Sequence, residues 1–363
     1  MQKVLFAINK FSLGGAERLV VDQVNELGRK GYEVHTLTLL LEDDTTLQPQ
    51  LIIPSSHQHA VAVKGMCDVR AFNAIKRLLV EHRFDTVVTN LFLTNTYVRA
   101  AAHAAGVPHI FSYEHSVYAD KRAWQIMIDR FLARYTEKII VGASDVQLFT
   151  AKQEHLSESK FALNHNAADM STLHISEDRG RALRERFHIP EEAVLVVAAG
   201  RLIEQKGHQY LIEAASHISE NMHVLIFGKG TLEQELQALI VERGLGKKVQ
   251  LAGIGDMSDI LSATDVFCMP SLWEGLSVAL TQAMAAGRAI VATDVSGTNE
   301  ALQNEKNGLL VPPKEVHALA NALQKLALDA GLRSRFGRAA QDASSQFSIE
   351  ENVKRLEAIM KNH

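Results

Sequence analysis

The sequence predicts an α/β fold of two doubly wound parallel-sheet domains that face a cleft between them. Short apolar runs alternate with helical patterns along the whole chain, which is typical of βα units. Most of these runs are continuous and not alternating, as in parallel strands that helices cover on both faces. The chain has 363 residues, too many for one ordinary core and suited to two.

Five apolar runs in the first half predict the strands of an N-terminal domain, residues 1–170. The runs span 4–9, 34–40, 85–90, 109–114 and 138–144. A helix is expected over 16–30, because Val20, Val24 and Leu27 share one helical face and Gly31 follows as a stop signal.

The second half repeats the alternation after a charged segment, 171–190, which contains the turn-favouring Pro190 and is interpreted as a linker. Residues 191–347 form the predicted C-terminal domain. Its strand candidates span 194–200, 223–228, 249–253, 265–270, 289–293 and 308–312, and its helices include 207–218 and 231–243. A final helix within 348–363 can pack on either domain, the N-terminal one included.

Composition excludes several classes of protein. The 47% hydrophobic and 22% charged residues are those of a globular domain, and a net charge of −4 argues against a dedicated nucleic-acid binder. Two distant cysteines, Cys67 and Cys268, predict no disulfide framework and suit a reducing cytosol. The chain has neither a signal peptide nor an apolar run of about 18 residues, so we expect a cytoplasmic protein that is soluble or peripherally attached.

Two loops combine features that bind anions. Gly14 and Gly15 precede the helix at 16–30, whose free N–H groups and dipole attract phosphate, although a plain βα turn has the same glycines. Arg201 ends the strand at 194–200 and Lys206 precedes the next helix. Two such cations can neutralise a diphosphate, or they can be solvated surface charges.

No metal-binding pattern accompanies these loops. The 16 histidines are scattered along the sequence without ligand spacing, and no paired aspartates follow a strand. We therefore expect no metal and no other cofactor.

The segment "EGLSVALTQ" places polar groups where a buried helix needs none. Glu274 lies beside a glycine, Ser277 begins the helix expected over 277–286, and Gln282 lies two turns beyond Glu274. The start of this helix offers free N–H groups to a phosphate. The pattern favours a site that binds hydroxyls beside a phosphate.

The stretch "PSLWEGLSVALTQAMAAGRAIVATDVSGTNEAL", with "GRLIEQKG" and "GGAERL" upstream, resembles retaining nucleotide-sugar glycosyltransferases of family 4, which share the GT-B fold of two Rossmann-like domains. The resemblance spans nearly the whole chain and is densest over 194–313. It implies transfer of a sugar from a nucleotide-sugar donor to a hydroxyl acceptor, without a metal and with retained anomeric configuration.

The resemblance also implies roles for matching residues. Gly14 and Gly15 would approach the donor diphosphate, while Arg201 and Lys206 would bind its phosphates. His115, which follows the strand at 109–114, resembles the family histidine that borders the transfer centre, although an ordinary strand-end histidine remains the alternative.

Glu274 would bind the hydroxyls of the donor sugar, and Ser277 and Val278 would offer backbone N–H groups to the phosphates. Ile254 falls where the family's backbone meets the nucleotide base. Gln282 replaces the second acidic residue of the family's Glu-x7-Glu motif, which holds the ribose. A glutamine still hydrogen-bonds but loses the charge assistance, so we expect weaker donor binding with catalysis retained.

The acceptor side is expected in the first half. Residues 119–135 combine Lys121, Arg122, Arg130 and Arg134 with apolar positions, as in helices on anionic membranes or in core helices with a solvated basic face. Many members of the family act on lipid-linked acceptors, in polysaccharide and lipopolysaccharide biosynthesis. UDP-sugars are favoured over GDP-sugars as donors. The alternatives are a nucleotide-sugar epimerase on this fold and a non-catalytic nucleotide-sugar-binding subunit.

Overall fold

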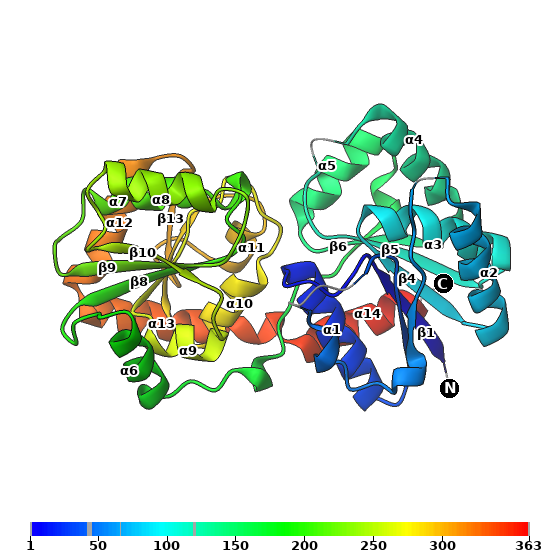
Figure 1. Cartoon of the computed structure of the whole chain (residues 1–363), viewed down its shortest axis with the longest axis horizontal. Helices are drawn as coiled ribbons and strands as arrows, with labels where there is room; N and C mark the ends of the chain where they lie inside the picture. The colour runs from blue at the N-terminus through cyan, green and yellow to red at the C-terminus, as the bar shows by residue number, and fades with distance from the viewer. Residues whose placement is uncertain (1, 42–45, 66, 119–120, 362–363) are drawn as a thin grey trace. The chain divides into compact units, whose positions relative to one another are not determined.

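The computed structural model describes residues 2–41, 46–65, 67–118 and 121–361. The chain divides into two compact units (Figure 1): residues 1–168 with 349–363, and residues 169–348. Each unit contains one sheet in which every pairing between named strands is parallel, so both predicted α/β domains are confirmed.

The sheet of the first unit has seven described strands in the order β3-β2-β1-β4-β5-β6-β7. These strands are β1 (Lys3–Ile8), β2 (Glu33–Thr38), β3 (Gln58–Ala60), β4 (Thr86–Asn90), β5 (His109–Glu114), β6 (Lys138–Val141) and β7 (Phe161–Leu163). The five predicted strands are all present. The two edge strands, β3 and β7, are missing from the prediction because three residues are too few to form a recognisable apolar run.

Helices cover both faces of this sheet. Buried apolar residues of α1 (Gly15–Arg29) and α14 (Ile349–Lys361) pack on one face. The opposite face is covered by α2 (Val69–His82), α3 (Phe92–Ala105) and α5 (Ser144–Glu154). A shorter helix, α4 (Ala123–Leu132), contacts α3 and α5.

The second unit has the strand order β10-β9-β8-β11-β12-β13. Its strands are β8 (Val194–Ala199), β9 (Met222–Phe227), β10 (Val249–Gly253), β11 (Val266–Met269), β12 (Ala289–Thr293) and β13 (Leu309–Val311). All six coincide with predicted strands.

Helices also enclose the second sheet. One face is covered by α7 (His208–Ala215), α8 (Glu233–Glu242) and α12 (Val316–Leu328). The other face carries α6 (Glu177–Arg186), α9 (Met257–Ala263) and α10 (Val278–Ala285). Two further helices are α11 (Thr298–Ala301) and α13 (Ala330–Ser344). Among the described helices, none is both long and apolar enough to cross a bilayer.

The segment 171–190 differs from the predicted linker. Its helix α6 packs against α9, where Leu183 is buried beside Ile260 and the backbone of Gly180 lies close to the carbonyl of Ser262. The charges that suggested a linker face solvent, since the Asp178 side chain is 93% exposed and that of Arg181 68%. The linker interpretation is wrong because a charged outer face conceals a buried inner one.

The last helix packs on the first unit, beside α1 (Figure 1). The buried amide of Gln23 donates to Asn352 Oδ1 at 2.8 Å, and Asn352 donates in turn to the carbonyl of His165 at 2.7 Å. Val353 and Leu356 are fully buried in the same interface. The last helix therefore completes the hydrophobic core of the first unit.

We predict that Leu356→Ala destabilises the protein by about 2–5 kcal/mol, because it leaves a cavity between α14 and the sheet. Chemical denaturation of the full chain measures this change in the free energy of unfolding. The exposed Glu350→Ala on the same helix is the matched control and should cost less than about 0.5 kcal/mol. Equal effects of the two substitutions would contradict the docking of α14.

Candidate functional site

Both sheets reverse their strand order at one point. In the second unit, β8 pairs with β9 on one side and with β11 on the other, so successive strands are added in opposite directions from β8. Loops leaving the carboxyl ends of such strands diverge, and ligands of open α/β sheets bind there. Arg201 and Lys206 follow β8, while Glu274 and Ser277 follow β11. The fold thus brings the two predicted motifs to the same edge.

Lys206 and Glu274 meet directly. The ammonium of Lys206 donates to Glu274 Oε2, which also accepts from the Ser271 hydroxyl at 3.2 Å. The amide of Gln205 approaches Glu274 Oε1 at 3.5 Å. The side chains of Lys206 and Glu274 are 14% and 10% exposed. The cation predicted for phosphate and the carboxylate predicted for sugar hydroxyls therefore form one largely buried pair.

Backbone contacts hold the two loops together. Gly207 has φ +60, and a Cβ there would clash with the carbonyl oxygen of Pro270. The N–H of Leu272 donates to the carbonyl of Gln205 at 2.8 Å. Because glycine alone tolerates both this φ and this approach, the loop that carries Lys206 can lie against the end of β11.

The helix α10 begins beside this pair in sequence. Ser277 is its N-cap, with an extended backbone, and the first intrahelical bond runs from the N–H of Thr281 to the carbonyl of Ser277. The N–H groups of the preceding residues, Val278 among them, have no acceptor within the helix and face its N-terminal side. Gln282 lies on the second turn and is half-buried.

The remaining predicted donor contacts of this unit are exposed. Arg201 makes no hydrogen bond or ion pair of its side chain within the described residues, and it is exposed. Ile254, directly after β10, is 45% exposed. Both follow carboxyl ends of strands in the same sheet as Glu274, so a cation and an apolar side chain are available to a ligand at that edge.

In the first unit, Gly14 is the N-cap of α1 and Gly15 its first residue. A Cβ at Gly14 would clash with the carboxylate of Glu17, which also accepts from the Ser12 hydroxyl at 3.1 Å. The anionic group at the start of α1 is therefore the chain's own Glu17 carboxylate. A phosphate at Gly14 would therefore have to displace Glu17, and the predicted diphosphate contact stays a prediction.

His115 follows β5 and is buried, with its ring stacked on Tyr113 at 4.4 Å. Its Nε2 lies 2.9 Å from Asn90 Oδ1. The amide nitrogen of Asn90 donates to the carbonyl of Ala7 at 3.2 Å, so its oxygen is the acceptor and His115 Nε2 carries the proton.

His115 Nδ1 is therefore a lone-pair acceptor, and it has no partner within the described part of the chain. Burial lowers the pKa of His115 to about 3, so the ring is neutral at physiological pH. A neutral imidazole in this orientation can accept a hydrogen bond from a hydroxyl, but it cannot supply a proton as an imidazolium.

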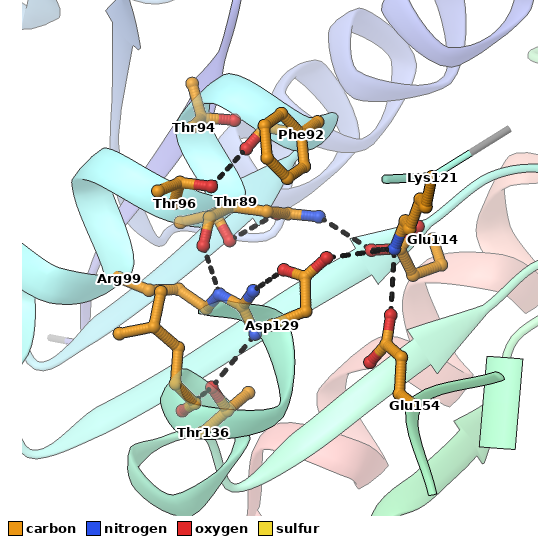
Figure 2. Close-up of polar contacts among 12 residues, drawn as sticks. Thr89, Phe92, Thr94, Thr96, Arg99, Glu114, Lys121, Asp129, Thr136 and Glu154 are labelled. Atoms are coloured by element: carbon orange, nitrogen blue, oxygen red, sulfur yellow. Dashed lines mark hydrogen bonds and ion pairs between the residues drawn. The ribbon is translucent and has the colours of Figure 1, made fainter. Parts of the chain in front are cut away.

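A buried charge cluster lies on the other side of β5 (Figure 2). Lys121 Nζ lies 3.0 Å from Asp129, 2.8 Å from Glu154 and 3.7 Å from Glu114. Arg99 pairs with the second oxygen of Asp129 at 2.5 Å. Lys121, predicted on the basic surface of a helix over 119–135, is instead buried, because three carboxylates surround it. Of that segment, residues 119 and 120 lie outside the described residues.

The cluster holds three carboxylates and two cations. Burial raises the pKa of Glu154 to about 7 even though Lys121 opposes it, and burial also raises the pKa of Glu114. Two cations cannot neutralise three buried anions, so one carboxylate retains its proton near neutral pH. Because Glu114 immediately precedes His115, the cluster fixes the backbone that positions the histidine.

Sequence reasoning missed several of these residues. Asn90 is the polar last residue of the otherwise largely apolar strand β4. A polar residue at the carboxyl end of a strand is a weak signal for a ligand site, and it could have been noticed. Ser271 and Gln205 lie inside the quoted motifs without an assigned role. Asp129 and Glu154 carry no local signal, since only the packing of α4 and α5 brings them to Lys121.

Comparison with protein families gives two matches. Residues 13–200 match the model described as Glycosyltransferase Family 4, and residues 181–343 match the model described as Glycosyl transferases group 1. Together the two matches cover both units and nearly all the motifs analysed above.

Similar proteins include two bacterial enzymes. One is the UDP-Gal:alpha-D-GlcNAc-diphosphoundecaprenol alpha-1,3-galactosyltransferase of Escherichia coli, 24% identical over 95% of this chain and 92% of that protein. Another is the N-acetylgalactosamine-N,N'-diacetylbacillosaminyl-diphospho-undecaprenol 4-alpha-N-acetylgalactosaminyltransferase of Campylobacter jejuni, 24% identical over 96% of both. Among solved structures, Anabaena HepE in complex with UDP and glucose is similar in fold, with a TM-score of 0.90 and 19% identity over the whole of both chains.

We predict that the charge cluster makes stability depend on pH. The pKa of Glu154 is about 7 in the folded chain, against about 4.3 in an unfolded one, so the folded state binds the extra proton. Its contribution to stability is complete below about pH 4 and is lost as the pH rises through 7.

Glu154→Gln keeps an acceptor for Lys121 but removes this titration. The free energy of unfolding of the variant, measured by denaturation from pH 5 to 8, should fall less steeply than that of the parent. Glu158→Gln, an exposed position four residues away, should follow the parent curve. Parallel curves for parent and Glu154→Gln would show that the extra proton is not on Glu154.

Proposed function

Because the chain belongs to Glycosyltransferase Family 4, we propose that it is a retaining, metal-independent hexosyltransferase. It moves a sugar from a nucleotide-sugar, UDP-linked in preference to GDP-linked, to a hydroxyl of a lipid-linked or cell-surface glycan. The observation that carries this proposal is the pair of Lys206 and Glu274 at the carboxyl edge of the second sheet, beside the strand-order reversal.

The donor phosphates bind at this edge. Arg201, Lys206 and the N–H groups at the start of α10 supply positive charge and hydrogen-bond donors without a metal ion. The ion pair with Glu274 holds the ammonium of Lys206 in place, so a phosphate would share an ammonium that is already positioned. Preorganised charge of this kind stabilises a departing diphosphate with little reorganisation.

The transfer step breaks the bond between the anomeric carbon and the oxygen of the donor phosphate. The acceptor hydroxyl attacks on the face that the phosphate leaves, and the released phosphate oxygen takes the hydroxyl proton. Glu274 accepts hydrogen bonds from the donor sugar, and the neutral His115 accepts one from a substrate hydroxyl at Nδ1. Gln282 binds the ribose and Ile254 contacts the base.

The surface of α4 supports peripheral contact with an anionic membrane. Trp124, Met127 and Phe131 are 40%, 70% and 52% exposed, and Arg130 and Arg134 are exposed beside them. Apolar side chains flanked by arginines suit the headgroup region of a bilayer. A cytoplasmic protein on the inner face of the membrane would meet the undecaprenol-linked acceptors named for its E. coli and Campylobacter relatives.

We predict that Lys206→Ala and Glu274→Gln each lower kcat by about a hundredfold or more, because each removes preorganised charge or a sugar contact at the reacting centre. Release of free nucleotide from a nucleotide-sugar and acceptor measures the rate. Lys247→Ala, an exposed position before β10, is the control and should match the parent. A non-catalytic binding subunit would release no nucleotide, and an epimerase would isomerise the donor instead.

We predict further that Gln282→Glu lowers the KM for the donor roughly fivefold, since a charge-assisted bond to the ribose adds about 1 kcal/mol. The rate at saturating donor should change little, because the position is remote from the reacting carbon. Gln237→Glu on the exposed face of α8 controls for added charge. An unchanged KM would argue against a ribose contact.

A further inference from the structure

Four histidines gather at the amino end of the first sheet, although they are scattered in the sequence. His35 lies on β2, His59 lies on β3, His57 ends the short turn of 3-10 helix just before β3, and His82 ends α2. The ring of His35 stacks on His57 at 3.9 Å and on His59 at 5.2 Å, and the rings of His59 and His82 are 4.8 Å apart. Strand pairing, and not sequence spacing, brings these histidines together.

Hydrogen bonds define the role of each ring nitrogen of His35. Its Nε2 lies 3.2 Å from Glu33 Oε1, and that oxygen also pairs with Lys3 Nζ at 2.8 Å. Because Glu33 Oε1 forms this ion pair with Lys3, it is the acceptor in its hydrogen bond with His35. His35 Nε2 therefore carries the proton, and Nδ1 accepts the hydrogen bond that His59 Nε2 donates at 2.9 Å.

We propose that His35, His59 and His82 form a binding site for a divalent first-row transition metal ion, with Zn²⁺ as the best-fitting ion. One ring nitrogen from each of the three lies within 4.8 Å of the others. Zinc–nitrogen bonds of about 2.0–2.1 Å in tetrahedral geometry place ligand nitrogens about 3.4 Å apart. Small ring movements satisfy this spacing, and water completes the coordination because His59 and His82 are half-exposed.

A metal ion would take the place of the hydrogen bond between His35 Nδ1 and His59 Nε2. The proton of that bond would move to the other nitrogen of His59 or be released, as protons are when metals bind histidine. Glu33 orients His35 from behind, as carboxylates do for many metal-bound histidines.

A second set, Glu33, His35 and His57, is equally compact but less suitable. Its carboxylate already accepts from His35 Nε2 and pairs with Lys3. His57 Nδ1 also lies 3.2 Å from the carbonyl of Val34. The set with His59 and His82 leaves these contacts intact.

The site is separate from the proposed transfer chemistry. Glu33 begins β2 and His82 ends α2, which precedes β4, whereas Gly14 and His115 follow the carboxyl ends of β1 and β5. In a parallel sheet these are opposite edges. An ion bound here would tie the short edge strand β3 and the end of α2 to β2, and its effect would be on stability.

The test uses the full chain, stripped with a chelator and titrated with Zn²⁺ by equilibrium dialysis, with Mg²⁺ in parallel. We expect one Zn²⁺ per chain, no Mg²⁺ binding at the same concentration, and a midpoint of thermal unfolding that rises with Zn²⁺. His59→Gln and His82→Gln should each abolish stoichiometric binding. Glu33→Gln should weaken it about 10–100-fold.

His103→Gln, which changes an exposed histidine of the same unit, should bind Zn²⁺ like the parent. Far-UV circular dichroism of the metal-free variants checks that each is folded. Because the two ligand variants change different elements, misfolding of one of them could not explain a loss of binding in both. The proposal is overturned if the parent binds no Zn²⁺, if binding survives in both ligand variants, or if only His57→Gln removes it.

Discussion

The parallel pairing of every strand in the two sheets is the constraint on which the functional architecture depends. It places all carboxyl ends of a sheet on one edge, and the reversal of strand order between β8 and β11 opens that edge to a ligand. Arg201 and Glu274 lie near each other along that edge because their strands, β8 and β11, are neighbours. With a different strand order, the same sequence motifs would lie too far apart to contact one ligand.

The contact between Lys206 and Glu274 shows how such an edge is prepared for an anion. A largely buried ammonium without a partner would be costly, and so would a largely buried carboxylate, so each holds the other in place. Gly207 makes the contact possible, since it lets one loop lie on the carbonyl of Pro270. The close approach of the two loop backbones is therefore the condition for the ion pair between Lys206 and Glu274.

The first unit uses histidine differently at the two ends of one sheet. At the carboxyl end, Asn90 fixes the proton of His115 on Nε2 and leaves Nδ1 open. At the amino end, Glu33 also fixes the proton of His35 on Nε2, while Nδ1 accepts a hydrogen bond from His59. Burial keeps both rings neutral. In each case a hydrogen bond to a neighbouring side chain fixes which ring nitrogen carries the proton, and so which nitrogen can accept.

The sequence by itself determined the two parallel-sheet domains, eleven of their strands and the family, because apolar runs and contiguous motifs are local patterns. It could not determine the edge strands β3 and β7, the buried face of α6, or the side on which α14 packs. The partners of Lys121, the pairing of Lys206 with Glu274 and the gathering of His35, His59 and His82 were decided only by the tertiary structure. Each of these joins residues from different elements, and the energy of such contacts depends on packing that leaves no periodic trace in the chain.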